Sequence, residues 1–165
     1  MEETLYILDH EEQQKTLQKL SLIEATEGGW TRKYCDPLTG DIWVLYYVRS
    51  EMHGGGFPVL RKGSLPENLS DRLSMAFASN REEDVIGLAW DLSSEYERWP
   101  EVLDWLEENS ESLSTKAVGL FIRCLTVMMP LNRCTTLNKP YEEVEADYTH
   151  FLRLAERAKR LVSGA

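Results

Sequence analysis

The sequence predicts a mostly α-helical α+β protein, in which a small β-sheet near the N-terminus is followed by an array of antiparallel helices. Runs of aromatic and β-branched residues, separated by turn residues, are confined to residues 1–63. From residue 64 onward, apolar residues recur instead at the spacing of amphipathic helices. We therefore expect a single domain over residues 1–165, with an α/β part at 1–63 and a helical array at 64–165.

The composition is that of a folded chain with no targeting or membrane segment. Hydrophobic residues make up 42% and charged residues 28% of the 165 residues, close to the globular average. No apolar run approaches the roughly 20 residues that cross a bilayer, and the acidic N-terminus is unlike a secretory signal. The three cysteines, Cys35, Cys124 and Cys134, lack C-x-x-C spacing. We expect a cytoplasmic protein with no disulfide framework, zinc site or membrane partner.

The first predicted helix follows a short apolar segment. Asp9 and Glu12 have the spacing of a capping box, in which an acceptor side chain precedes a glutamate by three residues. The helix would then continue through Leu17 and Leu20. Residues 5–8 before it form either a strand or an apolar lead-in to the helix.

Residues 30–35 and 42–48 have strand composition and are joined by the sequence Asp-Pro-Leu-Thr-Gly-Asp. Proline presets φ for a turn and glycine accepts a positive φ, so these segments predict a β-hairpin. Residues 42–48 are apolar on both alternating faces, which predicts a central strand covered on both sides. The glycines at 54–56 predict a tight loop, or a loop that contacts a partner, before a third strand at 57–60.

Two capping-box patterns open the predicted helical array. Ser64 and Glu67 have the spacing that starts one helix, and Asn80 and Glu83 repeat it for the next. Leucine and alanine residues at helical spacing follow both signals.

Prolines mark the boundaries of the remaining helices. Pro100 and Pro140 would stand in the first turn of two helices, where the missing N–H of proline costs little. Residues 117–129 are apolar nearly all round and end at Pro130, so this helix is expected at the centre of the array. Short connections make successive helices antiparallel, which predicts a HEAT-like stack of helix pairs.

The sequence contains no motif of a catalytic or metal site. The stretch His53-Gly54-Gly55-Gly56 is accompanied by neither a G-x-S-x-G nucleophile motif nor a G-K-[ST] phosphate loop. His10, His53 and His150 are far apart, and none lies in an H-E-x-x-H arrangement. We therefore predict no catalytic residue, no metal ligand and no cofactor.

The negative charge is concentrated between Arg81 and Glu111. Eleven acidic residues in this stretch face only Arg81 and Arg98, which leaves nine of the ten net negative charges of the chain. Such a chain is repelled by nucleic acid and by anionic membranes. The stretch is either a solvated face that aids solubility or a docking surface for a basic protein.

The docking interpretation selects residues on two successive predicted helices. Helical spacing puts Asp84, Asp91 and Glu95 on one side of the first helix. The same argument puts Glu101, Asp104 and Glu108 on one side of the second, so antiparallel packing could merge the two rows. Trp90 and Trp99 would supply aromatic anchors, unless Trp99 belongs to the core, since it also fits the inward side of its helix. The predicted partner-binding residues are Asp84, Trp90, Asp91, Glu95, Glu97, Glu101, Asp104 and Glu108.

A family resemblance rests on a set of residues in the predicted sheet. The set comprises Trp30, Tyr34, Asp36, Thr39, Gly40, Trp43, Ser50, His53, Gly54, Gly55, Gly56 and Pro58. It resembles the N-terminal signature of bacterial immunity proteins from polymorphic-toxin and contact-dependent inhibition systems. The resemblance implies a cytoplasmic antitoxin that occludes the active site of one cognate toxin, commonly a nuclease. It implies no catalytic residue and carries over no binding residue.

Three functional hypotheses follow. The first is an immunity protein that blocks a nuclease toxin, because a nuclease presents cations to its substrate and a carboxylate surface can replace the phosphates. The second is a helical adaptor or scaffold that binds a protein unrelated to toxins. The third is an enzyme without a recognisable motif. The toxin and the oligomeric state are not predicted.

Overall fold

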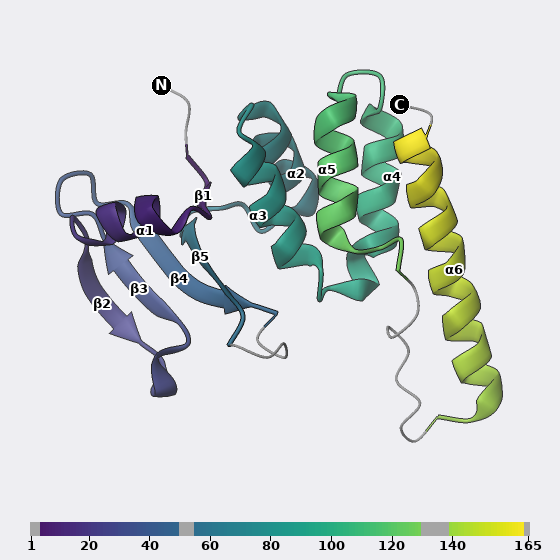
Figure 1. Ribbon diagram of the computed structural model, residues 1–165, viewed down its shortest axis with the longest axis horizontal. Coiled ribbons are helices and arrows are strands. Elements are labelled where there is room, and N and C mark those ends of the chain that lie inside the picture. Colours follow the sequence, from purple (N-terminus) through teal and green to yellow (C-terminus); the bar gives the residue numbers. More distant parts are fainter. Residues whose placement is uncertain (1–3, 50–54, 130–138, 164–165) are drawn as a thin grey trace. The chain divides into compact units, whose positions relative to one another are not determined.

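The computed structural model describes residues 4–49, 55–129 and 139–163, which form two compact units that meet in sequence at Leu88 and Ala89 (Figure 1). The predicted α+β class, with strands first and helices after, is confirmed. That the two units form one domain remains a prediction. Several residues used in the sequence analysis lie outside the described ranges, namely Ser50, His53, Gly54, Pro130 and Cys134.

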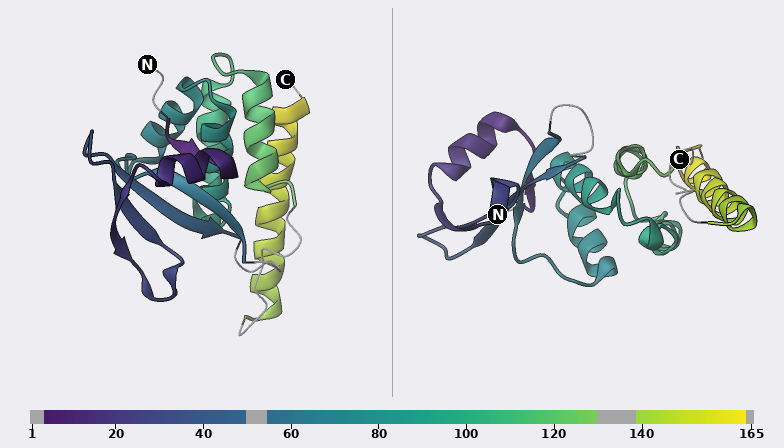
Figure 2. Two further views of the ribbon diagram at one scale, coloured as in Figure 1. Left: turned by 60° about the vertical axis from the view of Figure 1, so that its left-hand side comes forward. Right: turned by 90° about the horizontal axis from the view of Figure 1, so that it is seen from below.

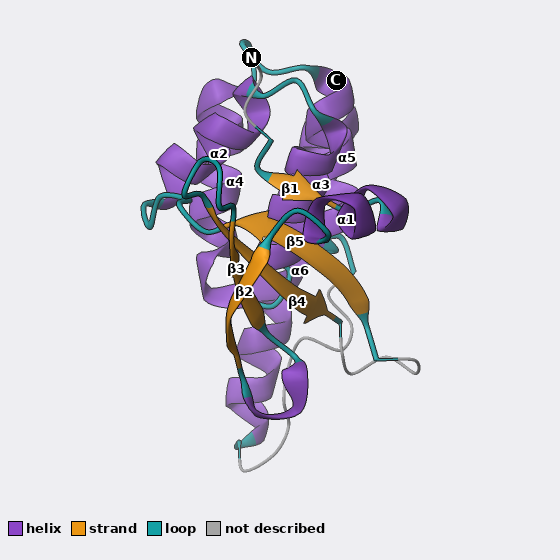
Figure 3. Ribbon diagram, turned by 90° about the vertical axis from the view of Figure 1, so that its left-hand side faces the viewer, coloured by secondary structure: helices purple, strands orange, loops and turns teal. Residues whose placement is uncertain are grey.

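The first unit contains a five-stranded antiparallel sheet rather than two or three strands, and Figure 3 shows these strands in orange. The predicted hairpin and third strand are present as β3, β4 and β5, and two further strands flank them. The order across the sheet is β1-β5-β4-β3-β2. The strand bounds are β1 Tyr6–Ile7, β2 Ser21–Ala25, β3 Arg32–Cys35, β4 Ile42–Val48 and β5 Phe57–Lys62.

The β3–β4 turn forms for the reason that its sequence suggests. The carboxylate of Asp36 accepts a hydrogen bond from the Leu38 N–H at 2.8 Å, and the Gly40 N–H donates to the Asp36 carbonyl at 2.8 Å. Gly40 has a φ of 79°, which a residue with a side chain rarely adopts. The turn thereby fixes the pairing of Cys35 with Ile42.

Helix α1 (His10–Leu17) begins where the capping box predicts, because Asp9 accepts a hydrogen bond from the Glu12 N–H at 2.9 Å. Leu17 and Leu20 pack against a buried cluster on the sheet formed by Ile7, Trp43, Leu45 and Leu60. This helix therefore covers one side of the sheet.

β4 is the central strand of the sheet, as predicted, but the prediction that it is covered on both sides is wrong. Trp43, Leu45 and Val48 are buried, but Ile42 and Tyr47 are exposed. The part of the strand that carries Tyr47 therefore has an uncovered face.

The helices α2 (Leu69–Ala78) and α3 (Glu82–Leu92) start later than their predicted caps. Asn68 caps α2 by accepting from the Asp71 N–H at 3.1 Å, so the predicted cap at Ser64 is wrong. Asn80 has a left-handed φ of 57° and does not cap α3. Both errors arise because any Ser or Asn three residues before an acid satisfies the pattern, whatever its backbone conformation.

The second unit contains the last turn of α3 and the elements η2 (Tyr96–Arg98), α4 (Trp99–Asn109), α5 (Thr115–Leu125) and α6 (Tyr141–Ser163). Both α4 and α5 contact α6, and Figures 1 and 2 show the three helices side by side. Trp99 is fully buried, and its indole N–H donates to the Leu92 carbonyl at 2.9 Å.

Prolines mark the starts of two helices in this unit, α4 and α6. Pro100 lies in the first turn of α4 and Pro140 directly precedes α6, as predicted. The apolar helix α5 ends at Leu125 rather than 129, because Thr126 adopts a left-handed φ of 63°.

Gly87 of α3 allows the helix to approach β1 closely. A Cβ atom at this position would lie 2.3 Å from Cγ of Tyr6, which is itself buried. Only a glycine fits there without movement of the Tyr6 ring.

We predict that Gly87→Ala lowers the free energy of unfolding by about 1–3 kcal/mol, as expected for overpacking. The measurement is urea denaturation. Gly119→Ala in α5 is the matched control, because its Cβ would meet only Arg123 Nη2, at 3.7 Å. The control should be neutral or stabilising by up to about 1 kcal/mol, since alanine is the better helix former. Equal stability of both variants and the natural protein would contradict the packing argument.

Candidate protein-binding surfaces

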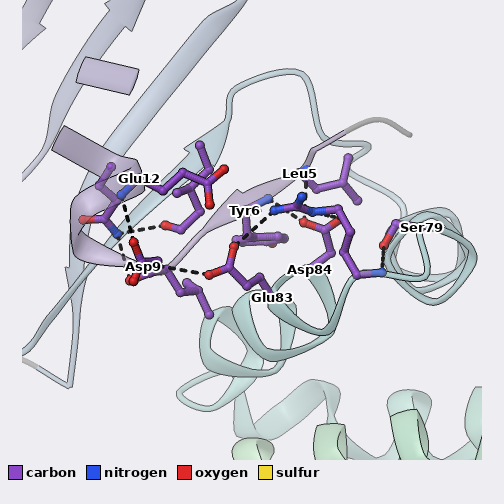
Figure 4. Close-up of polar contacts among 11 residues, drawn as sticks. Leu5, Tyr6, Asp9, Glu12, Ser79, Glu83 and Asp84 are labelled. Carbon is purple, nitrogen blue, oxygen red and sulfur yellow. Dashed lines mark hydrogen bonds and ion pairs between the residues drawn. The ribbon is translucent and has the colours of Figure 1, made fainter. Parts of the chain in front are cut away.

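Asp84 is buried, so its predicted place on an acidic surface is wrong. Its side chain is 0% exposed, and Oδ1 accepts hydrogen bonds from the N–H groups of Leu5 at 3.1 Å and Tyr6 at 2.8 Å (Figure 4). Oδ2 faces Arg81 Nε at 3.8 Å. The carboxylate therefore joins α3 to β1, and no part of it is accessible to a partner.

Glu83 supports the same junction from the first turn of α3. One carboxylate oxygen accepts from the Asp9 N–H at 3.0 Å, and the other accepts from Arg81 at 3.1 Å. These contacts also hold Asp9, the residue that caps α1. The two acids that follow one another in the sequence thus support the structure of the first unit.

The remaining predicted residues of α3 do not form the expected row. Trp90 and Asp91 are half-buried in the last turn of the helix, and Glu95 lies beyond its end at Leu92. Glu95 pairs with Arg98 at 3.3 Å. The prediction of one helical row through Asp84, Asp91 and Glu95 is wrong because α3 ends before Glu95 and Asp84 points inward.

Helix α4 carries an exposed row of acids, which we call the acidic face: Glu101, Asp104, Glu107 and Glu108. Val102, Leu103 and Leu106 on the opposite side of the helix are buried. Glu97 is also exposed, in η2 directly before α4. The spacing of Glu101, Asp104 and Glu108 thus gives the side of the helix that the sequence predicts.

Arg157 of α6 binds two members of the acidic face. Its Nε and Nη2 donate to the two oxygens of Glu107 at 3.0 Å and 2.8 Å, and Nη2 also donates to Asp104 at 2.6 Å. The hydrogen bonds that Arg157 donates, chiefly to Glu107 and also to Asp104, raise the pKa of Arg157 above its ordinary value. The guanidinium orders these two carboxylates. A third member of the acidic face, Glu101, lies 3.9 Å from Arg98 Nε.

No sequence pattern predicts this contact. Arg157 lies 50 residues after Glu107, and its position fits equally well the basic last turns that favour a helix dipole. Only the packing of α6 against α4 selects it from the other bases of that helix.

A second exposed surface lies on the sheet. The indole ring of Trp30 packs edge-on against Tyr47 with 5.6 Å between the ring centroids, yet Trp30 is 54% exposed. A Cβ atom on Gly28 or Gly55 would lie 3.2 Å or 3.8 Å from the indole. The ring is therefore held in place while one side remains open to solvent.

Residues 13–62 match the family model described as Immunity protein 27. The chain is thus similar to bacterial immunity proteins. This confirms the resemblance predicted from Trp30 and the residues that follow it. The comparisons with curated proteins and with solved structures found no match.

The immunity-protein segment, residues 13–62, covers β2 to β5 and most of α1. It contains Trp30 and Tyr47 but no member of the acidic face. It carries seven basic and five acidic residues, in contrast to the rest of the chain. The family match and the acidic face are therefore independent observations.

Metal binding and membrane insertion are not supported by the described residues. Among the described residues, no group of three His, Cys, Asp or Glu side chains is placed to hold a metal ion. No described helix combines the length and apolar character needed to cross a bilayer.

We predict that Asp84→Ala lowers the free energy of unfolding by at least about 2 kcal/mol, because two buried N–H groups lose their acceptor. Asp84→Asn keeps a carbonyl oxygen and should lose less. Thermal and urea denaturation provide the measurement. Identical stability of Asp84→Ala and the natural protein would show that the buried carboxylate contributes nothing to the fold.

We also predict that Arg157→Ala destabilises the protein by about 1 kcal/mol, the upper range for partly exposed ion pairs. Arg157→Lys keeps the charge but not the two-pronged geometry, and should give an intermediate loss. Urea denaturation at low and at 1 M salt separates the ionic part, since salt should reduce the difference. A loss that is unchanged by salt would indicate lost packing instead.

Proposed function

We propose that this protein is an immunity protein that inhibits a cognate nuclease toxin by binding it through the acidic face of α4. The match over residues 13–62 supports the immunity class, and the acidic face supports the choice of partner. The protein acts as a stoichiometric inhibitor and catalyses no reaction.

The chemistry of nucleases supports a carboxylate surface as the inhibitory element. A nuclease holds a polyanionic substrate and must present lysine and arginine side chains around its active site. Glu101, Glu108 and the nearby Glu97 are exposed and can pair with those cations. Concentrated opposite charge also steers association, raising its rate to about 10⁸–10⁹ M⁻¹s⁻¹ at low salt.

The contact with Arg157 makes the acidic face better suited to binding. Glutamate side chains lose rotamer entropy when a partner orders them, which costs roughly 0.5–1.5 kcal/mol for each side chain. Arg157 already orders Asp104 and Glu107 through three hydrogen bonds. Two carboxylates are thus arranged before a partner arrives.

The place of action is the cytoplasm, where a nuclease toxin meets its substrate. Among the described residues, Cys35 and Cys124 form no disulfide bond, which agrees with a reducing compartment. A cytoplasmic location agrees with the immunity function that the family match supports.

An adaptor that binds a host protein is the second candidate, and the same acidic face favours it for a basic partner. A toxin gene directly beside the gene of this protein would favour the immunity function. Co-purification with a protein other than that toxin would favour the adaptor.

We predict that reversing three exposed charges together, by Glu97→Lys, Glu101→Lys and Glu108→Lys, weakens toxin binding at least about 100-fold. The toxin used is the neighbouring toxin domain, meaning the one encoded directly beside the gene of this protein. Cells that carry the variant should lose protection against the toxin. These positions leave the contacts of Arg157 intact, and Glu101→Lys removes the exposed 3.9 Å contact with Arg98. Calorimetric titration and a toxin co-expression assay provide the measurements.

A matched control carries the same change of net charge elsewhere, at Glu11, Glu12 and Glu67, which are all exposed. It should bind within about threefold of the natural protein, since these positions lie outside the acidic face. Equal toxin affinity of both triple variants would show that the acidic face does not bind the toxin.

A further inference from the structure

The two edge strands of the sheet, β1 and β2, differ in whether their outer backbone groups have hydrogen-bond partners. At β1, the carboxylate of Asp84 accepts the N–H groups of Leu5 and Tyr6, so a side chain occupies the place of a further strand. On the inner side of the same strand, the buried Gln13 donates to the carbonyls of Ile7 at 2.8 Å and Pro58 of β5 at 3.0 Å, which ties β1 to its neighbour. The β1 edge is therefore closed from within the chain.

The β2 edge is open along its whole length. Ser21–Ala25 pairs with β3 on one side, and within the described ranges no strand lies on the other. All five residues are exposed, including Leu22 at 58% and Ile23 at 56%. A row of backbone donors and acceptors beside exposed aliphatic side chains is a template for another strand.

The devices that usually protect an edge are nearly missing from β2. The strand has no lysine or proline, and its single charge, Glu24, is paired with Lys33 at 2.9 Å. A bulge between Leu22 and Glu24 is the one protective feature. A protein that closes one edge with a buried carboxylate and leaves the other open has an edge suited to a partner.

We propose that β2 binds an extended strand of the toxin, which adds to the sheet as a sixth strand. This proposal rests on the proposed immunity function. Main-chain hydrogen bonds supply affinity in such complexes, and alternate side chains supply specificity. Leu22 and Ile23 would be covered by apolar residues of the added strand.

The charges around β2 indicate which side chains the added toxin strand should carry. Lys19, Arg32 and Lys33 are exposed at or beside the edge, and Glu24, which lies in β2 itself, is paired with Lys33 at 2.9 Å. The added strand is therefore expected to carry acidic side chains between its apolar ones. The same excess of cations disfavours pairing with a second copy of β2, which would bring like charges together.

This surface differs in sign from the acidic face of α4. The toxin would present cations to α4 and an acidic strand to β2. Two contacts of opposite sign exclude partners that match only one of them, which provides specificity beyond attraction to any basic protein.

The test is amide hydrogen exchange of the full chain, alone and in complex with the neighbouring toxin domain. The proposal predicts that exchange of amides in Leu22–Ala25 slows at least about tenfold in the complex. The variant Ile23→Lys should weaken toxin binding at least tenfold. Leu38→Lys is the control, because Leu38 is 92% exposed in the β3–β4 turn, away from the edge, and it should bind within about twofold.

Each outcome discriminates between the proposals. Toxin binding with unchanged exchange at β2 would overturn the strand addition and leave the immunity function standing. No toxin binding at all would overturn both. Protection of β2 that grows with protein concentration in the absence of toxin, with a dimeric mass, would replace the toxin strand by a second copy.

Discussion

The buried carboxylate of Asp84 is the contact on which the first unit depends. It accepts the N–H groups of Leu5 and Tyr6, and so ends the sheet at β1 and attaches that strand to the start of α3. Tyr6 then packs where Gly87 leaves room for its ring. Oδ2 of the same carboxylate makes no hydrogen bond and faces Arg81 Nε at 3.8 Å. A buried charge is costly unless it is paired, so this junction tolerates little variation. With one edge closed in this way, the open side of the sheet is at β2.

The sequence predicted the parts of this architecture that local rules determine. The Asp36 turn, the Asp9 cap and the exposed side of α4 follow from turn chemistry, capping and helical period, and the structure has all three. Asp84 was misplaced because an acid in the first turn of a helix ordinarily faces solvent and the helix dipole. Its partners lie 78 and 79 residues away, beyond the reach of any pattern.

The strand β2 and the role of Arg157 escaped prediction for a related reason. Ser21–Ala25 is exposed throughout, so it lacks the alternation of buried and solvated residues that identifies a strand in sequence. Pairing with β3 alone makes it a strand. Arg157 became part of the acidic face only through packing of α6 against α4. The open β2 edge and the ordered carboxylates of the acidic face are both exposed. The proposed immunity function would use them to bind the toxin.

We propose that the toxin binds at two surfaces that the fold leaves exposed, the acidic face of α4 and the β2 edge. The crystal structure of the complex with the neighbouring toxin domain tests it most directly. We expect toxin lysines or arginines within 4 Å of Glu101 and Glu108, a distance typical of ion pairs, and a toxin strand paired with β2. A complex in which both the acidic face and the β2 edge remain in solvent would contradict the account.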